Sequence, residues 1–162
     1  MPEPVIAIDD PRARDVRALL EQHLRFAHDT TPIDHIHALD LEGLLDPAVT
    51  LYSLREGGKL LGIGAIRQLD DHHAELKSMH TVVGARGRGL GRAMLGHLLS
   101  VAIERGVDRV SLETGTMEAF APARALYASA GFEPCGPFGD YQPSPSNTFM
   151  TMELGGRAGG SR

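Results

Sequence analysis

The sequence lacks the features of several common classes of protein. Its 162 residues contain no Trp, three Tyr and five Phe, too few aromatic side chains for a platform that stacks single-stranded nucleic acid. The formal net charge of −5 also disfavours a general nucleic-acid binder. No apolar run reaches the ~20 residues of a membrane helix, and no basic start followed by an apolar run suggests a signal peptide. We therefore expect a cytoplasmic protein that binds neither nucleic acid nor membranes.

Cysteine is represented only by Cys135, so the chain can form no internal disulfide and has no CxxC pair for zinc. A reducing compartment fits this composition. No arrangement of histidines points to Cys135 as a nucleophile. His35 and His37 are two residues apart, and His72 and His73 are adjacent in a predicted turn, but no spacing supplies a third ligand. We expect no bound metal.

What the chain does contain is a succession of short apolar segments and helical patterns, and 42% of its residues are apolar, enough for one core. Strands are expected at 5–8, 49–55, 60–69, 74–83, 107–114 and 148–154, with a further strand region from Phe132. Helices are expected after Asp10 and at 33–45, 90–105 and 118–130. We predict a single domain over residues 2–154 and a flexible tail over 155–162.

The order of these elements predicts an α/β fold in the α+β sense. Successive hairpin strands in the first half favour antiparallel pairing, and the later strand–helix–strand passages favour parallel crossovers. Asp10 is expected to cap the first helix, with Pro11 at its first position. Alternation within 74–83 places one set of side chains on one strand face (Leu76, Ser78, His80, Val82) and a second set on the other (Glu75, Lys77, Met79, Thr81).

The most informative segment is the glycine-rich, basic loop at 86–92, between a predicted strand and the strongest predicted helix. Glycine lets the backbone approach a ligand closely, and the first N–H groups of a helix lack intrahelical partners. Together with the helix dipole they form a site for an anion, typically phosphate. Arg86, Arg88 and Arg92 add positive charge at a helix end where arginine is not preferred, which suggests an anionic ligand.

Two familiar phosphate motifs do not match this loop. The P-loop pattern fails because Leu90-Gly91 stands where Lys-Ser/Thr is required, and the dinucleotide pattern fails because Gly87, Gly89 and Gly91 are each two residues apart. The pattern R-x-x-G-x-G does match, and residues 82–91 read V-V-G-A-R-G-R-G-L-G. This segment resembles the cofactor loop of the GNAT superfamily of acyl-CoA-dependent N-acetyltransferases, with Gly84 in place of the usual proline.

A second segment strengthens the resemblance. Residues 123–132 read A-R-A-L-Y-A-S-A-G-F and are similar to the family pattern A-x-x-L-Y-x-x-x-G-F. The resemblance extends over residues 5–154 in element order. It implies a mostly antiparallel central sheet flanked by helices, with a parallel strand pair on either side of the helix that follows the loop. It also implies an N-acetyltransferase that uses acetyl-CoA as co-substrate and a primary amine, on a small molecule or a protein, as acceptor.

The resemblance also implies roles for individual residues. Amides of the loop would bind the CoA pyrophosphate, and the strand backbone just before it would bind the pantetheine and orient the acetyl carbonyl. Tyr127 would protonate the departing thiolate. Phe120 stands where the family commonly has a cofactor-binding Asn. The implied cofactor-binding residues are Thr81, Val82, Val83, Arg86, Gly87, Arg88, Gly89, Leu90, Gly91, Arg92, Phe120 and Ala123.

The acceptor amine must lose a proton before it attacks the thioester, so a general base is useful. Glu113 and His80 are the candidates, with Glu75 farther from the loop as a third, and water wires could replace all of them. A backbone N–H near Val82 is expected to stabilise the oxyanion.

The acceptor pocket should be built by the variable parts of the chain, namely the first two helices, the strand ends and the loop 138–141. Several acidic residues could recognise a cationic amine: Asp29, Asp34, Asp40 and Glu42.

Two other functions stay open at this point. The first is a non-catalytic acyl-CoA-binding regulatory module, although the intact Tyr127 favours transfer. The second is an anion-binding regulatory domain without CoA specificity. An exposed final strand could also pair with a second copy and form a homodimer.

Overall fold

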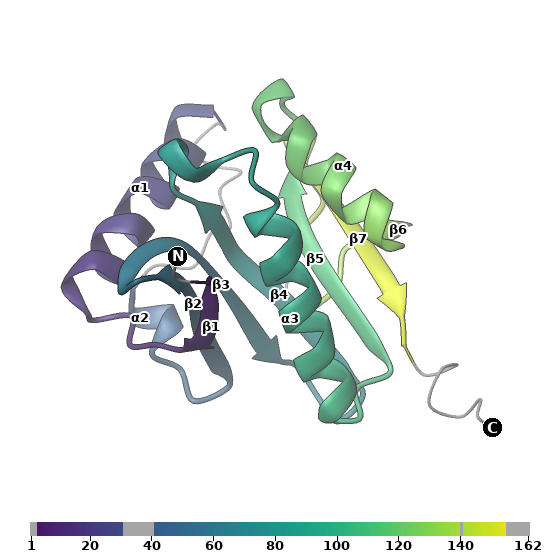
Figure 1. The fold of residues 1–162 in the computed structure, drawn as a ribbon. Helices are drawn as coiled ribbons and strands as arrows, with labels where there is room; N and C mark the ends of the chain where they lie inside the picture. Colours follow the sequence, from purple (N-terminus) through teal and green to yellow (C-terminus); the bar gives the residue numbers. More distant parts are fainter. Residues whose placement is uncertain (1–2, 31–40, 140, 155–162) are drawn as a thin grey trace.

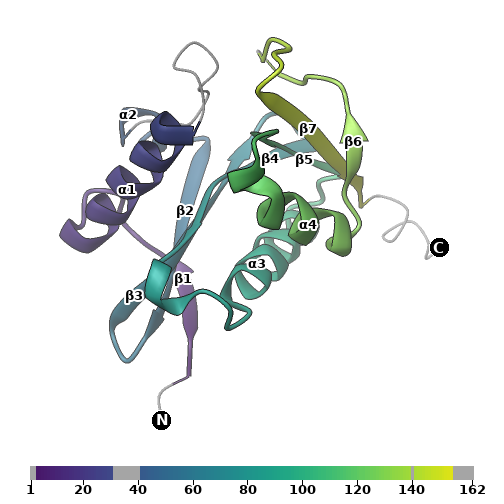
Figure 2. The same cartoon turned by 90° about the horizontal axis from the view of Figure 1, so that it is seen from above.

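A computed structural model describes residues 3–30, 41–139 and 141–154 of the chain. A single seven-stranded sheet runs through the molecule, and helices pack on both of its faces (Figures 1 and 2). Among the described residues, no helix combines the length and the apolar character needed to span a bilayer. The tail predicted at 155–162 lies outside the described residues.

The order of strands in the sheet is β1-β2-β3-β4-β5-β7-β6. The strands are β1 (Val5–Ile8), β2 (Val49–Glu56), β3 (Lys59–Gln68), β4 (His73–Thr81), β5 (Arg109–Gly115), β6 (Glu133–Cys135) and β7 (Asn147–Glu153). Every described pair of neighbours is antiparallel except β4 and β5, which are parallel. The mixed, mostly antiparallel sheet expected from the sequence is confirmed, and so is its one parallel pair.

The helices divide between the two faces of the sheet. One face carries α1 (Arg14–Thr30) and α2 (Leu41–Leu44), and the other carries α3 (Leu90–Glu104) and α4 (Ala121–Ala130), as Figure 2 shows from above. Two short 3₁₀ turns, η2 (Val83–Ala85) and η3 (Glu118–Phe120), precede α3 and α4. Because each face is covered, the core has two parts, one around Leu98 and Leu112 under α3 and α4, and one around Val16 and Ile63 under α1.

The connection between the parallel strands is α3, which packs tightly on the sheet (Figure 1). Its residues Leu95 and Leu98 are fully buried, as the apolar stripe of the sequence predicts. Gly64 on β3 allows this close approach, because a Cβ there would lie 2.8 Å from Cγ of Met94. The helix ends at Glu104 with Arg105 as its C-cap, and Gly106 follows with a φ of +78°, the left-handed conformation that commonly terminates a helix.

Two predictions about the first helices are wrong or lie outside the described residues. The first helix starts at Arg14, and Asp10 instead closes a preceding turn, accepting the N–H of Arg12 at 2.9 Å on its carboxylate. The carbonyl of Ala13 accepts the first helical N–H, that of Arg17, at 2.8 Å. Of the helix predicted at 33–45, residues 33–40 lie outside the described residues, and the part described is the single turn α2.

The predicted alternation along β4 holds only up to Lys77. Ser78 has a φ of +57°, and the register between β3 and β4 shifts opposite it, between Ile63 and Ala65. This bulge inserts one residue, so Met79 joins the core under α3 and α4 together with Leu76. His80 faces α1, where its ring meets that of His23. A bulge is set by pairing with a distant strand, so a period of two within the sequence could not reveal it.

A homodimer was expected because the final strand would be exposed, and the structure does not support that reason. Strand β7 lies inside the sheet, paired with β5 from Arg109 to Gly115 on one side and with β6 on the other. The described sheet ends instead at β1 and at β6, a strand of three residues. The sequence could not show that the short segment after Phe132 would add itself outside the final strand.

Candidate active site

A cavity opens where the two parallel strands separate. Residues 73–76 of β4 pair with residues 109–112 of β5, and the pairing stops there. A cavity of about 420 Å³ follows, lined by the second half of β4, the end of β5 and the first turns of α3 and α4. Parallel strands that part at their carboxyl ends are a common location for ligand sites, because backbone groups there lack a neighbouring strand.

The glycine-rich loop lies beside this cavity. Gly87 and Gly89 have φ values of +84° and +79°, conformations that L side chains rarely adopt. Gly89 is the N-cap of α3 and offers no side chain to the first N–H groups of the helix, which leaves them for an anion. Gly91 faces α4 closely, since a Cβ there would lie 3.5 Å from Leu126. These features fit the diphosphate of a CoA.

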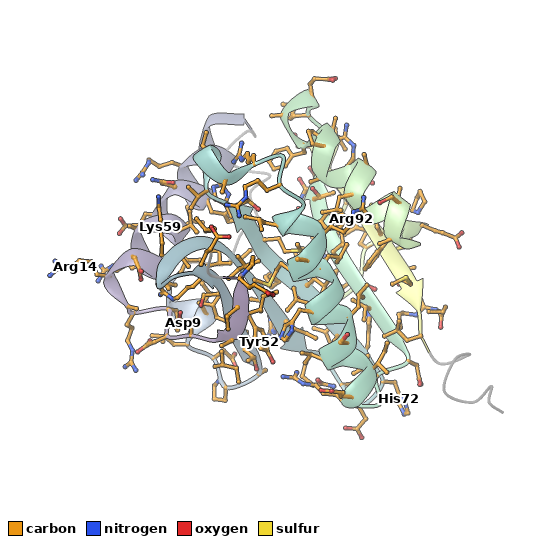
Figure 3. All side chains as sticks on the ribbon, viewed as in Figure 1. Asp9, Arg14, Tyr52, Lys59, His72 and Arg92 are labelled. Carbon is orange, nitrogen blue, oxygen red and sulfur yellow. The ribbon has the colours of Figure 1, made fainter. Side chains whose placement is uncertain are left out.

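The three arginines of the loop extend in different directions. Nε of Arg86 donates to the carbonyl of Thr81 at 3.3 Å, and Arg88 forms an ion pair with Glu56 at 2.6 Å. Arg92 reaches from α3 to the hydroxyl of Ser129 on α4 at 3.3 Å, and Figure 3 shows it between these helices. All three side chains are exposed, so they can add positive charge around the mouth of the cavity without a large cost of burial.

Half of the residues predicted to bind the cofactor line the cavity: Thr81, Arg86, Leu90, Gly91, Phe120 and Ala123. The others lie around it without lining it: Val82, Val83, Gly87, Arg88, Gly89 and Arg92. The N–H of Val82 is bonded to the carbonyl of Leu61 at 2.8 Å. That amide is therefore already used, which argues against its expected role as the donor to an oxyanion.

All three predicted catalytic residues line the same cavity, although they come from three separate elements. Tyr127 of α4 is 9% exposed, and its hydroxyl lies 3.8 Å from Sδ of Met79 on β4. Burial raises the pKa of Tyr127 to about 12. The phenol therefore keeps its proton at neutral pH and is a weaker acid than an ordinary tyrosine.

Glu113 of β5 is mostly buried and accepts a hydrogen bond from the side-chain amide of Asn147 on β7. Burial raises the pKa of Glu113 to about 7, and the nearby Glu75 raises it as well. The ammonium of Lys77 and the amide of Asn147 oppose this rise because both favour the carboxylate. A carboxyl group with a pKa near neutrality can accept a proton and release it again under cellular conditions.

His80 of β4 has a different environment. Its Nδ1 lies 3.2 Å from Nδ1 of His23 on α1, and the two rings meet edge to face. Burial, together with the positive charge of Arg86, lowers the pKa of His80 to about 4. His80 is therefore neutral at pH 7 and is a much weaker base there than Glu113.

A polar cluster that the sequence did not reveal lies beside Glu113. The ammonium of Lys77 lies 2.9 Å from the carboxylate of Glu75, and their side chains are 7% and 3% exposed. The hydroxyl of Tyr141 accepts a hydrogen bond from Lys77 and donates one to Glu75. Burial and the adjacent Glu75 raise the pKa of Tyr141. The only signal in the sequence is a pair of opposite charges two residues apart on one strand.

Tyr141 belongs to the loop expected to build the acceptor pocket. Its ring packs against Phe138 and Phe149, which anchors the loop over the sheet, on the face opposite α3 and α4. The other acceptor-side candidates are not described: Asp34 and Asp40 lie outside the described residues, and so do the side chains of Asp29 and Glu42. From α1, His23 lines the cavity.

The described residues contain no group of three His, Cys, Asp or Glu side chains that could hold a metal ion. His72 pairs with Asp108 at 2.9 Å and His73 contacts Ser111 at 2.7 Å, while His35 and His37 lie outside the described residues. Burial raises the pKa of the Cys135 thiol, which disfavours the nucleophilic thiolate.

Comparison with known proteins gives one consistent result. The family model described as Acetyltransferase (GNAT) family matches residues 13–132. The uncharacterized N-acetyltransferase YsnE of Bacillus subtilis is 44% identical over 149 residues, 92% of this chain and 99% of that protein.

Solved structures agree with this match. A proposed acyl-CoA N-acyltransferase from Klebsiella pneumoniae superposes with a TM-score of 0.76 at 27% identity, covering 93% of this chain and 97% of that one. A GNAT family acetyltransferase from Elizabethkingia anophelis, solved with acetyl-CoA bound, has the same fold, with a TM-score of 0.69 at 15% identity. The match covers 93% of this chain and 98% of that one.

Proposed function

Because the chain belongs to the GNAT family of N-acetyltransferases, we propose that it moves the acetyl group of acetyl-CoA directly to a primary amine within a ternary complex. The amine belongs to a small molecule or to a protein. One observation carries the proposal. Tyr127, Glu113 and the start of α3 all line a single cavity at the point where β4 and β5 separate. A proton donor, a proton acceptor and an anion site are thereby within reach of one bound thioester.

The cofactor would lie with its diphosphate at the N-terminus of α3 and its pantetheine between β4 and β5. The left-handed Gly87 and Gly89 support this orientation, as do the uncapped N–H groups of the helix. Phe120, whose ring covers Gly115 at the end of β5, would form one wall of the cofactor channel. A Cβ on Gly115 would lie 2.3 Å from that ring, so this wall depends on glycine.

The transfer step then needs several proton movements. The ammonium of the acceptor first gives one proton to the base; the neutral nitrogen bonds to the thioester carbon while the carbonyl π electrons move onto the oxygen, and the nitrogen gives a second proton to water as the amide forms. The tetrahedral species collapses, the C–S bond breaks, and the thiolate of CoA takes a proton from the hydroxyl of Tyr127. A Tyr127 pKa of about 12 means that the phenol is protonated at neutral pH, so its hydroxyl can share its proton with the sulfur as negative charge develops there.

Glu113 is the better candidate for the base that receives the proton of the amine. Its pKa of about 7 suits a carboxylate that must accept a proton at neutral pH, whereas His80 with a pKa of about 4 would accept one weakly. Glu75 is engaged with Lys77 and Tyr141. We assign the role of general base to Glu113. His80 lines the same cavity and is assigned only a supporting role.

A titration with acetyl-CoA tests the cofactor site. At 100 times the dissociation constant, acetyl-CoA should stabilise the wild type by about 2.7 kcal/mol. Gly89→Glu should abolish this shift because it adds a carboxylate where the diphosphate binds. Gly106→Glu is the matched control: both glycines flank α3 with φ near +79° and +78°, and neither Cβ would meet an atom within 4 Å. If the wild type shows no shift, the assignment of the loop to acetyl-CoA is wrong.

A thiol-release assay with a panel of primary amines tests transfer. Small amines, polyamines, amino acids and peptide N-termini should be compared, and at least one should release CoA faster than water does. Binding of acetyl-CoA without release by any amine would favour the alternative, a non-catalytic acyl-CoA-binding regulatory module. The cytoplasmic location expected from the sequence stays a prediction.

A further inference from the structure

Ser78 combines two unfavourable features at the bulge of β4. Among the described residues it is the only non-glycine residue with a positive φ, +57°. Its hydroxyl oxygen is also buried without a hydrogen-bond partner in the described structure. The residue is 9% exposed. Left-handed backbone and an unsatisfied buried hydroxyl both cost stability, and such strain persists mainly at functional sites.

The position of Ser78 gives this hydroxyl a use. Ser78 lines the cavity where the pairing of β4 with β5 has ended, between Lys77 and Met79. Met79 contacts the hydroxyl of Tyr127, the proposed donor to the departing thiolate. Ser78 and Tyr127 therefore line the same cavity, in which the thioester would react. The hydroxyl proton can rotate toward an acceptor, which a backbone N–H cannot do.

A hydrogen-bond donor at the thioester carbonyl accelerates the reaction, and a side chain can supply one. Negative charge develops on the carbonyl oxygen as the amine attacks, and donors aimed at that oxygen accelerate acyl transfer. The N–H of Val82 is already bonded to Leu61. We propose that the side-chain hydroxyl of Ser78 donates a hydrogen bond to the thioester carbonyl of the acyl-CoA and stabilises the oxyanion of the tetrahedral intermediate.

This inference rests on the proposed function and assigns one atom within it. The carbonyl oxygen gains the π electron pair when the amine nitrogen bonds to the carbon, and the hydroxyl proton of Ser78 is shared with that oxygen without being transferred. When the intermediate collapses, the electron pair returns to the carbonyl and the thiolate leaves with the proton from Tyr127. Ser78 ends the cycle as it began, as a neutral hydroxyl.

Infrared spectroscopy of bound acetyl-CoA tests the assignment without knowledge of the acceptor. Acetyl-CoA labelled with ¹³C at the carbonyl should bind the wild type with its carbonyl stretch at lower frequency than in an apolar solvent. In Ser78→Ala and Ser78→Gly the stretch should move to higher frequency. The dissociation constant of acetyl-CoA should change less than about threefold, because the diphosphate supplies most of the binding. With any active amine, kcat should fall about 10²-fold.

The two variants and a control separate chemistry from folding. Ser78→Gly relieves the strained backbone as well as removing the hydroxyl, so it should raise Tm and still lose the carbonyl shift. Ser111→Ala deletes another buried hydroxyl, on β5 and outside the cavity, bonded to His73 and Thr151. It should lower Tm and leave the carbonyl frequency as in the wild type.

The outcomes distinguish this inference from the proposed function. An unchanged carbonyl frequency in both Ser78 variants with acetyl-CoA bound would overturn the role of Ser78 alone. Failure of the folded wild type to bind acetyl-CoA would overturn the cofactor assignment and the role of Ser78 with it. A frequency shift in Ser78→Gly that Ser111→Ala does not reproduce would support the inference.

Discussion

The side-chain amide of Asn147 donates a hydrogen bond to the carboxylate of Glu113 across the two neighbouring strands β7 and β5. The residues are 34 positions apart in the chain. The bond orients a carboxyl group whose pKa is about 7 toward the cavity. It also lowers that pKa, because the amide stabilises the charged form. The strand order, which places β7 beside β5, therefore helps to set the pKa of Glu113.

Replacement of Glu113 by Gln should remove the base. We expect kcat/KM to fall about 10²-fold or more, because general base catalysis typically contributes that much. In the wild type, kcat/KM should rise as pH increases through about 7, where Glu113 loses its proton. This acid limb should vanish in the variant. A pH–rate profile measured with one active amine decides the matter.

His80→Gln provides the comparison for that experiment. With a pKa of about 4, His80 would place an acid limb near pH 4 if it were the base. We expect the variant to keep the limb near pH 7 and at least a tenth of the wild-type rate. A wild-type profile whose acid limb lies near pH 4 and disappears only in His80→Gln would transfer the role of base from Glu113 to His80.

Glu113 should also make stability depend on pH. Its pKa is raised from 4.5 to about 7 in the folded state, so the folded protein binds the proton more tightly than the unfolded chain. Its contribution is favourable below about 4.5 and is lost as pH rises through about 7. Relative to the wild type, Glu113→Gln should therefore gain stability over this window, by as much as roughly 3 kcal/mol. Urea unfolding at pH 4.5 and 8 measures the change.

Tyr127→Phe should slow transfer without weakening the cofactor site. We expect kcat to fall about 10²-fold, the low end for a general acid, because a thiolate leaves readily even without protonation. The dissociation constant of acetyl-CoA should stay within about threefold. Tyr52→Phe makes the same chemical change at a buried residue outside the cavity and should leave kcat unaltered. Equal losses in the two variants would mean that Tyr127 has a structural role.

The buried pair of Lys77 and Glu75 should show strong coupling. Lys77→Met leaves the carboxylate of Glu75 buried without its cation and should cost about 3–5 kcal/mol. The double variant with Glu75→Gln should lose less than the sum of the two single variants, and urea unfolding measures each value. Arg109→Met breaks an exposed pair with Glu153 and should cost about 1 kcal/mol or less. Additive losses at Lys77 and Glu75 would contradict the coupling.

Much of the fold and part of the site could be predicted from local sequence. The strands and the long helix α3 follow from periodicity, and the loop before α3 follows from its glycines and arginines. Tyr127 was found because its motif is contiguous along one helix. Glu113 was found because it ends a strand. Each of these features depends on about ten neighbouring residues, so it can be recognised without knowledge of the fold.

Other parts of the site depend on contacts between distant segments. Asn147 begins the last strand and Tyr141 lies in the loop before it, and each meets its partner only after β7 inserts between β5 and β6. The orphan hydroxyl of Ser78 exists because β3 and β4 pair with a shifted register. Neither the strand pairing nor the shifted register leaves a pattern in the nearby sequence, so neither could be predicted from it.

The sequence by itself determined the element order and the family, and it singled out the glycine-rich loop and Tyr127 as site candidates, because each depends on residues that are close together in the chain. The tertiary structure decided which face His80 and Met79 occupy, that the final strand is internal, and which carboxyl group has a pKa near 7. The physical reason is that burial and strand register are properties of the assembled sheet. Desolvation of Glu113 arises only when β4, β5 and β7 enclose it.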